Sequence, residues 1–410
     1  MQCEVHMKIT DVKTILLTGP CTNDPFLSEC RTRRSAAFIE IHTDSGHTGI
    51  GETYAGYFCP EIVPEVVAFF KPILIGRAID NIQELWNQMY HCGNFWCRTG
   101  LGAIVLTGIE SALWDLKGKF YGLPVYTLLG GLTHDRLPAY ATGGPSNYPL
   151  DNLARKIDFY LAQGFTGFKI GAGCFTKEKG FYMPMTPAEA ASFEGEKMAF
   201  ARKHSGPGTR IMMDGHMGNS PAGTWNLQTA KAVMKAVAPY NLFFFEEPLH
   251  YTDPWAYSEL CKTSAVPIAG GECLTTQSEW RVFTEHQSFD IAQPDASHIG
   301  SLTEFIKVAG MFEASGRKIA PHAWGAGGSL MQNIHCAFAC ANTAVVEVPP
   351  AFAELHGMVM GDSFRMKDGY VLPPETPGLG IVLTDEIKAR FPFVPGSGEF
   401  NSVPGKILTD

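Results

Sequence analysis

The chain carries few positive charges for its length. Its 410 residues include 32 Lys and Arg against 41 Asp and Glu, a formal net charge of −9, and no basic run interrupts the sequence. Proteins bind nucleic acid through clustered Lys and Arg, so no nucleic-acid partner is expected. An acidic protein that handles an anion needs a local cation, which favours a bound metal ion.

Long apolar runs are also missing. No stretch reaches the roughly 18 apolar residues that span a bilayer, and residues 1–7 lack the basic start and apolar core of a secretory signal. The 11 cysteines are an odd number without repeated spacing, so neither a disulfide framework nor a zinc site is predicted. These absences favour a cytoplasmic enzyme with reduced thiols and no membrane partner.

The 45% hydrophobic and 18% charged residues are typical of a globular protein. Two different orders of expected strands and helices divide the sequence into domains. Strands followed by helices predict an α+β domain over residues 1–135. Strand–helix alternation then predicts a second domain over 136–350. The Pro- and Gly-rich residues 351–410, with a hairpin signal near 366–372, are expected to fold back onto the first domain. The elements expected in the first domain are strands at 7–18, 36–43 and 48–53 and helices at 61–70, 81–91 and 103–119.

Eight short apolar runs in the second domain stop on a polar or glycine-rich end. Runs of this kind are typical of strands buried on both faces of a parallel sheet. Their spacing fits one βα unit each, which predicts a closed (β/α) TIM-type barrel. The tip residues are Tyr140, Lys169, Asp214, Glu246, Glu272, Asp295, His322 and Glu347.

Three successive tips, Asp214, Glu246 and Glu272, are carboxylates. Barrel enzymes keep their chemistry at the carboxyl ends of the strands, and three hard oxygen ligands suit Mg²⁺. The alternative is that each acid caps the helix that follows it, which the joint spacing disfavours. Side chains alternate along a strand, so only one of Glu246 and Glu247 is expected to face the mouth. We assign Glu246 as the ligand and Glu247 to an outer position.

Other tips supply candidate proton carriers. Lys169 lies between Phe168 and Ile170, and both burial and a nearby cation would lower its pKa and make it a base. Alternatively, Lys169 pairs with a metal-ligand carboxylate. Asp295 and His322 end neighbouring strands, and a carboxylate beside an imidazole forms a general acid or base. As a lone residue, His322 would be a satisfied core histidine.

Two further residues have open interpretations. Glu347 could donate a hydrogen bond to a substrate oxygen if a dry site keeps it protonated. His216, two residues past Asp214, is either an acid over the metal or a loop histidine. The glycine cluster 325–328 lacks phosphate-loop and dinucleotide patterns, and is interpreted as a loop that admits the substrate close to the backbone.

The segments 19–34 and 51–60 of the first domain are expected to close over the mouth and select the substrate. Arg31, Arg33 and Arg34 in the first segment could meet a distal carboxylate, which would make the substrate a diacid. The alternative is solvated surface charge.

Taken together, these residues resemble the mandelate racemase subgroup of the enolase superfamily over nearly the whole chain. The resemblance implies a modified (β/α) TIM-type barrel with an α+β capping domain built from the N-terminal region and the C-terminal tail. The family's metal acids, strand-two lysine, His–Asp dyad and strand-eight glutamate match the tips named above. Gly167 replaces the first lysine of the family's Lys-X-Lys, which puts the basicity of Lys169 in doubt. Asp-Gly-His at 214–216 is similar to sugar-acid dehydratases, in which that histidine protonates the leaving hydroxyl.

The resemblance implies a Mg²⁺-dependent dehydratase of an aldonate or aldarate. Lys169 or His322 would take the proton α to the carboxylate, and His322 or His216 would protonate the departing hydroxyl, giving a 2-keto-3-deoxy acid. The first alternative is a racemase or epimerase that uses Lys169 and His322 on opposite faces of the α-carbon, and the second is a noncatalytic sugar-acid binding protein. A homo-oligomer is expected. The sequence leaves open which sugar acid is bound.

Overall fold

A three-stranded antiparallel sheet begins the chain, with β2 between β1 and β3. The computed structural model describes residues 7–27, 32–176, 179–218, 220 and 223–397. The cap elements are β1 (Ile9–Pro20), β2 (Arg33–Thr43), β3 (Thr48–Thr53), α1 (Ala55–Phe58), α2 (Val63–Leu74), α3 (Ile82–Cys92), α4 (Leu101–Tyr121) and α5 (Val125–Leu128). The expected order of strands and helices is confirmed, but β2 begins earlier than predicted and includes Arg33 and Arg34.

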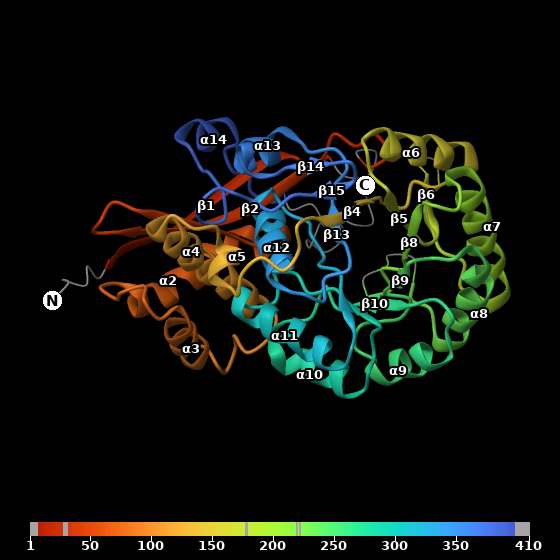
Figure 1. The fold of residues 1–410 in the computed structure, drawn as a ribbon, viewed down its shortest axis with the longest axis horizontal. Coiled ribbons are helices and arrows are strands. Elements are labelled where there is room, and N and C mark those ends of the chain that lie inside the picture. The colour runs from red at the N-terminus through yellow and green to blue at the C-terminus, as the bar shows by residue number, and fades with distance from the viewer. Residues whose placement is uncertain (1–6, 28–31, 177–178, 219, 221–222, 398–410) are drawn as a thin grey trace.

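Helix α4 packs directly on β3, and glycine makes this contact close. A Cβ at Gly49 would lie 2.1 Å from the carbonyl oxygen of Ala112, and one at Gly51 would lie 2.3 Å from that of Gly108. Only a strand without side chains at these positions can approach the helix backbone so closely. The end of β3 is thereby held close against α4, in the part of the chain that lies beside the barrel (Figure 1).

The second part of the chain forms the barrel. Neighbouring strands pair in parallel in the order in which they occur along the chain. β13 pairs with β4, and a parallel bridge joins Ile319 to Thr343, just before β13, so the circle closes. The strands are β4 (Leu137–Thr142), β5 (Gly167–Gly171), β8 (Arg210–Asp214), β9 (Phe244–Glu246), β10 (Ile268–Gly270), β11 (Ile291–Ala292), β12 (Lys318–Ile319) and β13 (Val346–Val348).

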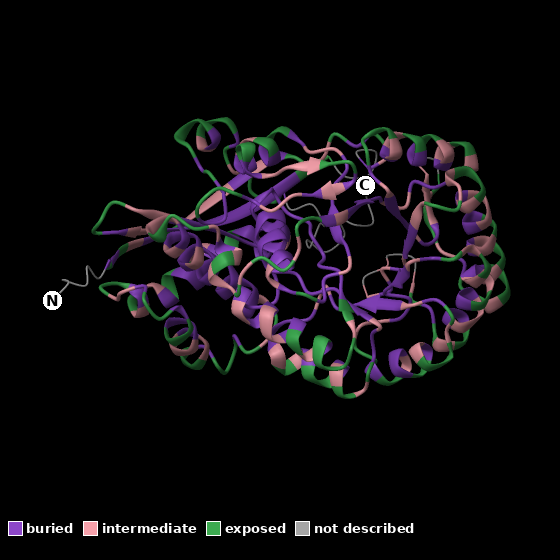
Figure 2. Cartoon of the chain, in the orientation of Figure 1, coloured by how far each residue is buried: buried purple, intermediate pink, exposed green. Residues whose placement is uncertain are grey.

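Helices surround these strands, and most are buried on the side that faces the barrel and exposed outside (Figure 2). They are α6 (Leu150–Ala162), α7 (Pro187–Ser205), α8 (Leu227–Val237), α9 (Pro254–Thr263), α10 (Thr276–Glu285), α11 (Leu302–Ala314) and α12 (Gly328–Ala339). The last of them is buried along almost its whole length. The predicted capped barrel is therefore confirmed. A short hairpin, β6 (Cys174–Thr176) and β7 (Gly180–Tyr182), follows β5.

Side chains alternate between the barrel interior and the helices, as the period of a strand requires. Met212, Phe244 and Val345 belong to one buried cluster inside the barrel. The residues two positions further along β8, β9 and β13 are Asp214, Glu246 and Glu347. Their side chains therefore leave the strands on the interior side, above the apolar floor.

The tail contacts both parts of the chain. Its hairpin, β14 (Met366–Lys367) and β15 (Tyr370–Val371), pairs with β4 of the barrel, and not with the first domain as expected. Later tail residues do reach the cap, where Leu379 donates its backbone N–H to Asp115. The remaining tail helices are α13 (Glu354–Met360) and α14 (Asp385–Arg390).

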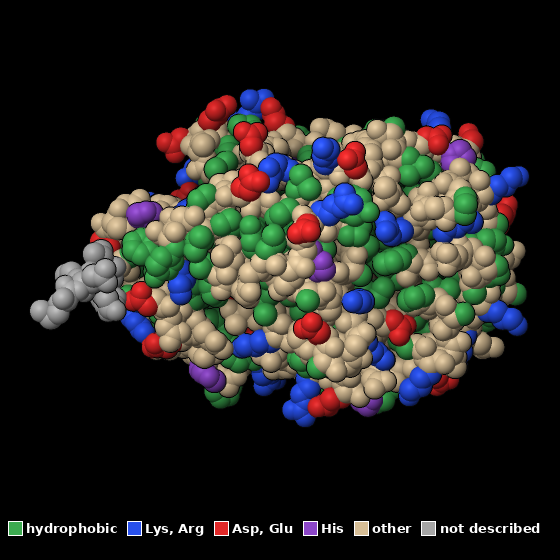
Figure 3. Space-filling view, in the orientation of Figure 1, with side chains coloured by type: hydrophobic (Ala, Val, Ile, Leu, Met, Phe, Trp, Pro, Cys, Tyr) green, Lys and Arg blue, Asp and Glu red, His purple; other side chains and the backbone are tan. Residues whose placement is uncertain are grey.

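Charges of both signs are interspersed on the face drawn in Figure 3, without a basic patch. None of the described helices has the length and apolar character needed to cross a bilayer.

Candidate active site

Three carboxylates meet at the mouth of the barrel. Asp214 and Glu246 are directly paired at the ends of β8 and β9, and Glu272 follows the end of β10 by two residues. All three side chains are largely buried, with Asp214 the most exposed at 13%. The structure therefore places these three acids at the same end of the barrel, and their role as metal ligands stays a prediction.

Lys169 lies among acids. Its Nζ is 2.5 Å from Glu246 Oε2, 3.1 Å from Glu347 Oε1 and 3.4 Å from Asp214 Oδ2. Burial lowers the pKa of Lys169, but the charges of Glu246, Glu347 and Asp214 outweigh it and raise the pKa well above its ordinary value. The pairing of Lys169 with a carboxylate predicted as a metal ligand, the alternative considered for it, is present, and the lowered pKa expected beside a bound cation stays a prediction.

Several oxygens at the mouth are buried without a hydrogen-bond partner: Glu246 Oε1, Glu247 Oε1 and Glu272 Oε2. Burial and the charges of neighbouring acids raise the pKa of Glu246 and Glu247. His216, Glu247 and Glu272 offer ligand atoms that lie within 4.8 Å of one another. Buried anionic oxygens are costly unless a partner or a cation satisfies them, so the site fits a hard divalent ion such as Mg²⁺.

Glu247 does not turn away from the mouth, and the expectation that only one of the two glutamates faces it is wrong. β9 ends at Glu246, and Glu247 adopts a positive φ of 40°, so strand alternation no longer applies to it. The chain after β8 passes very close, since a Cβ at Gly215 would lie 2.4 Å from the Glu247 carbonyl oxygen. Glu247 is consequently a further carboxylate of the site.

The predicted dyad is formed. His322 Nδ1 lies 2.7 Å from Asp295 Oδ2, and His322 Nε2 lies 3.5 Å from Glu272 Oε2. Burial lowers the pKa of His322, but Glu272 and Asp295 raise it to about 10. The other Asp295 oxygen accepts hydrogen bonds from Ser297 N and Oγ, each 2.7 Å, and from Asn333 Nδ2 at 2.9 Å. The imidazole is therefore held by Nδ1, and its Nε2 faces the acids.

His216 joins the same group of residues. It has a φ of 50°, and its Nε2 lies 3.6 Å from Glu272 Oε1. Its side chain is 34% exposed, against 10% for His322. Because the two imidazoles contact different oxygens of Glu272, a molecule at this carboxylate would meet both.

Glu347 is placed as an acceptor and not as the expected donor. Its Oε1 lies 3.1 Å from the Lys169 ammonium, and its Oε2 accepts the backbone N–H of Ala323 at 3.1 Å. Glu347 thereby links Lys169 to the segment that carries His322.

The arginines of the first expected lid segment differ in their surroundings. Arg33 is exposed, and Arg31 lies outside the described residues. Arg34 is fully buried, contacts the carbonyl oxygen of Gly325 and stacks on the ring of Trp324, 4.4 Å from its centroid. Neither the solvated charge nor the substrate contact considered for Arg34 describes this buried side chain.

The glycine cluster 325–328 lets a cap residue approach its backbone closely. A Cβ at Gly325 or Gly328 would lie 2.9 Å from a carboxylate oxygen of Glu52. Sequence reasoning missed Glu52 because nothing in the sequence near the end of β3 indicates a partner almost 280 residues away.

Tyr54 and His298 were also missed. The Tyr54 ring lies 5.7 Å from that of His322 and 5.6 Å from that of His298, both edge-on. Burial lowers the pKa of His298 to about 4, which makes it a neutral imidazole beside the dyad. The expected reach of segment 51–60 toward the mouth was the available signal for Tyr54, and the position of His298 three residues past Asp295 was the signal for His298.

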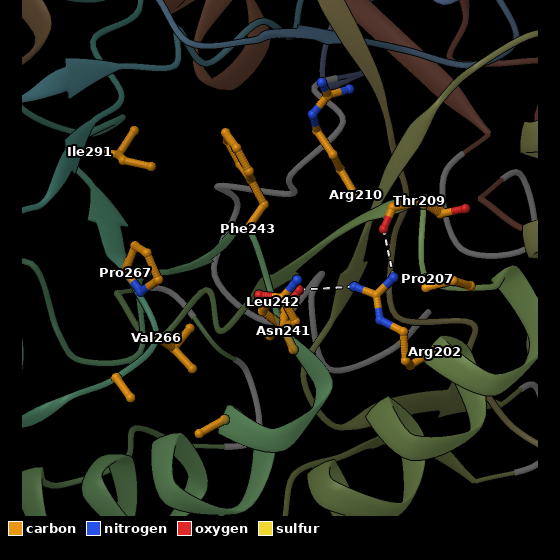
Figure 4. Close-up of a pocket in the computed structure, with 13 residues that line it drawn as sticks. Arg202, Pro207, Thr209, Arg210, Asn241, Leu242, Phe243, Val266, Pro267 and Ile291 are labelled. Atoms are coloured by element: carbon orange, nitrogen blue, oxygen red, sulfur yellow. Dashed lines mark hydrogen bonds between the residues drawn. The ribbon is translucent and has the colours of Figure 1, made fainter.

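A cavity of about 570 Å³ lies at the other end of the barrel, around the starts of β8 to β11. In Figure 4, Arg202 of its lining donates to the carbonyl oxygens of Thr209 and Asn241. None of the strand-tip acids or histidines lines this cavity, so it is separate from the site at the mouth.

Comparison with known proteins agrees with this architecture. Residues 12–130 match the mandelate racemase/muconate lactonizing enzyme N-terminal domain family, and residues 152–387 match the enolase C-terminal domain-like family. The D-galactonate dehydratase of Ralstonia nicotianae is 32% identical over 356 residues, 85% of this chain and 89% of the relative.

Two solved structures are similar over almost the whole chain. One is L-talarate dehydratase from Polaromonas sp. JS666 in complex with Mg and L-glucarate, with a TM-score of 0.79 and 28% identity over 94% of this chain and 98% of that one. The other is the 3,6-anhydro-D-galactonate cycloisomerase from Zobellia galactanivorans, with a TM-score of 0.80 and 26% identity over 94% of this chain and 99% of that one.

Proposed function

The chain belongs to the mandelate racemase/muconate lactonizing enzyme family of the enolase superfamily and is a hydro-lyase, and from that premise we propose that it is a Mg²⁺-dependent dehydratase of an aldonate or aldarate. One observation carries the proposal. The acids Asp214, Glu246 and Glu272 converge at the barrel mouth, with Lys169 on one side and the His322–Asp295 dyad on the other.

Asp214, Glu246 and Glu272 would hold the metal ion, with Glu247 and His216 beside them. When bound, Mg²⁺ would neutralise the acids around Lys169, which lowers the pKa of the amine, and would stabilise negative charge developing on the substrate carboxylate. The unpartnered buried oxygens at the mouth support this assignment.

We assign the removal of the α-proton to His322. Asp295 holds its Nδ1 at 2.7 Å, so Nε2 is the nitrogen that can exchange a proton with the substrate. A cation bound to Glu272 would offset the charge that raises the pKa of His322, and would thereby let Nε2 act as the base. Lys169 is held by three acids, which supports His322 over Lys169 for this step. The electron pair of the C2–H bond moves toward the carboxylate. It then forms the C2–C3 double bond as the C3–O bond breaks.

The departing hydroxyl needs a proton, and His216 is our assignment for its donor. Its position on the opposite oxygen of Glu272 from His322 supports the division of roles. Water leaves, and the enol at C2 tautomerises to the 2-keto-3-deoxy acid. Lys169 and Glu347 would fix the charge on the other side of the substrate.

The partner of this site is a small sugar acid, and we expect the enzyme to act in the cytoplasm as a homo-oligomer. The similarity to a galactonate dehydratase and to a dehydratase bound to glucarate supports mono- and diacid sugars as the compounds to test.

Incubating the protein with a library of such acids and Mg²⁺ tests the proposal, with semicarbazide detection of the keto product. At least one acid should yield a keto acid, and replacement of Asp214 by Asn should abolish its formation. Substrate consumption by the D214N variant at the wild-type rate would contradict the proposed metal site.

A second candidate is a racemase or epimerase. It is favoured by the placement of Lys169 and His322 against different acids of the mouth, Glu246 and Glu272, since two bases on opposite faces of an α-carbon invert it. Incubation in deuterium oxide separates the candidates. Inversion with deuterium uptake and no keto acid indicates the racemase, and loss of water indicates the dehydratase.

A further inference from the structure

A carboxylate of the cap ends at the start of α12, in the barrel domain. Glu52, on β3, is 3% exposed. Its Oε1 accepts the backbone N–H of Ala326 at 2.7 Å, and its Oε2 accepts that of Ser329 at 2.7 Å. Its own N–H donates to Gln332 Oε1 at 2.8 Å. Glu52 therefore satisfies the first turn of α12, as a capping side chain does, but from the other domain.

The residue whose backbone N–H Glu52 accepts, Ser329, also begins a chain of buried side-chain hydrogen bonds that leads to the dyad. Ser329 Oγ lies 2.6 Å from Ser297 Oγ, and Ser297 Oγ lies 2.7 Å from Asp295 Oδ1. Each hydroxyl has one proton to donate. Because Asp295 can only accept as a carboxylate, Ser297 donates to it and must receive its own hydrogen bond from Ser329. The directions of both bonds are thus fixed.

These hydrogen bonds determine which oxygen of Asp295 is free to bind His322. Three donors occupy Oδ1, from Ser297 and Asn333. Oδ2 is left for His322 Nδ1 at 2.7 Å. Partners of this kind keep a carboxylate ionised and fix the orientation of the imidazole that it holds. The cap reaches Ser297 a second time, because Tyr54 N donates to the Ser297 carbonyl oxygen at 3.0 Å.

We propose that Glu52, Ser329 and Ser297 are positioning residues through which the cap holds the Asp295–His322 dyad. Docking of the cap and alignment of the proton-transferring imidazole are then one event. The proposal rests on the proposed function, in which His322 moves the α-proton.

A matched control lies in the same cap. Glu110, on α4, is also buried and accepts the backbone N–H of Leu302 at 2.9 Å and the Thr303 hydroxyl at 2.6 Å, in the first turn of α11. Among the contacts of the described residues, none of its hydrogen bonds leads to Asp295. Glu52→Gln and Glu110→Gln each introduce an amide N–H₂ opposite a backbone N–H, so both disturb a cap-to-barrel contact in the same way.

The test compares turnover of the identified sugar acid. Loss of outer hydrogen bonds to a catalytic group costs about 10- to 100-fold in activity, so we expect E52Q and Ser297→Ala to lower kcat by that factor with KM unchanged. E110Q should keep kcat within twofold of wild type. Equal loss of kcat in E52Q and E110Q would overturn the proposal.

The order of the chain gives a second test, which holds even if E52Q does not fold. In a linear chain, Ser329 acts on the dyad only through Ser297. The double variant S297A/S329A should therefore be no slower than S297A, although S329A alone is slower than wild type. If the reductions in turnover of the two single variants multiply in the double variant, the two serines act separately, which contradicts a linear hydrogen-bond chain.

A spectroscopic readout separates this proposal from the proposed function. The His322 Nδ1 proton, identified by its loss in His322→Asn, should resonate downfield and exchange slowly in wild type and E110Q, and should exchange rapidly in S297A and E52Q. If no sugar acid is turned over but this pattern appears, the proposed function is contradicted and the role of the hydrogen-bond chain is supported. If turnover is found and the exchange of this proton is unaffected in S297A, the proposed function is supported and the role of the hydrogen-bond chain is contradicted.

Discussion

Replacing Lys169 by Met removes the one ammonium group that the mouth acids contact in the described structure. Methionine keeps the length and apolar stem of the lysine and leaves out its charge. Glu246, Glu347 and Asp214 would then lie within one buried site without a cation. Their repulsion, together with the desolvation of each charge, destabilises the folded chain.

The size of the effect follows from burial and distance. Removing one partner of a buried ion pair costs about 3–5 kcal/mol, and Lys169 is 2% exposed with its closest carboxylate at 2.5 Å. Since the ammonium serves three acids, we expect the upper part of that range in metal-free protein. Added Mg²⁺ should restore much of the loss, because it replaces the missing positive charge. Wild type itself should gain about 2.7 kcal/mol at a Mg²⁺ concentration 100 times the dissociation constant.

The assay is urea unfolding with a chelator and with excess Mg²⁺. Lys197→Met is the matched control. Lys197 and Glu194 form a fully buried ion pair with an N–O distance of 2.6 Å, and among the contacts of the described residues none joins Lys197 to Asp214, Glu246 or Glu272. Both variants should lose stability with the chelator, and Mg²⁺ should stabilise K169M well beyond K197M. A loss below 1 kcal/mol in K169M, or equal responses of both variants to Mg²⁺, would refute the reasoning.

Three further predictions concern histidines. His322→Asn should lower turnover by about 10²- to 10⁴-fold, the usual contribution of a general acid or base, and abolish exchange of the α-proton measured by NMR in deuterium oxide. His216→Asn should lose keto-acid formation to a similar extent but retain that exchange; loss of both would contradict its role as the acid for the leaving hydroxyl. Burial lowers the pKa of His335 to about 3, so this imidazole stays unprotonated in the folded state at pH values below about 6.5, where the unfolded chain binds a proton. Its contribution to the free energy of unfolding is present above pH 6.5 and falls by about 2 kcal/mol between pH 6.5 and pH 5. In urea titrations, the stability of His335→Gln should therefore depend less steeply on pH than that of wild type or of a variant of the exposed His91. Equal pH dependence in all three would show that His335 is not the source.

The strand-tip residues were predictable because local pattern decides them. An apolar run that stops on Asp214 or Glu246 indicates a strand buried on both faces that ends at that residue, and β8 and β9 do end there. The same local logic failed one residue later. Glu247 has a positive φ, and no sequence rule announces that a strand ends between two adjacent glutamates.

Environment and distance account for the other failures. The sequence indicated that Lys169 is buried but not that it contacts Glu347, from a strand nearly 180 residues away. The contact of Glu52 with Ser329 likewise requires the cap to be docked before it exists. A contact between neighbouring strand tips, such as His322 with Asp295, could be predicted, whereas contacts between elements far apart in the chain needed the coordinates.

The most direct test of the account is the metal dependence of keto-acid formation from the best sugar acid found. Protein stripped by a chelator should form no product, Mg²⁺ should restore it in proportion to site occupancy, and D214N should stay inactive at any Mg²⁺ concentration. Full turnover by a metal-free preparation would contradict the account.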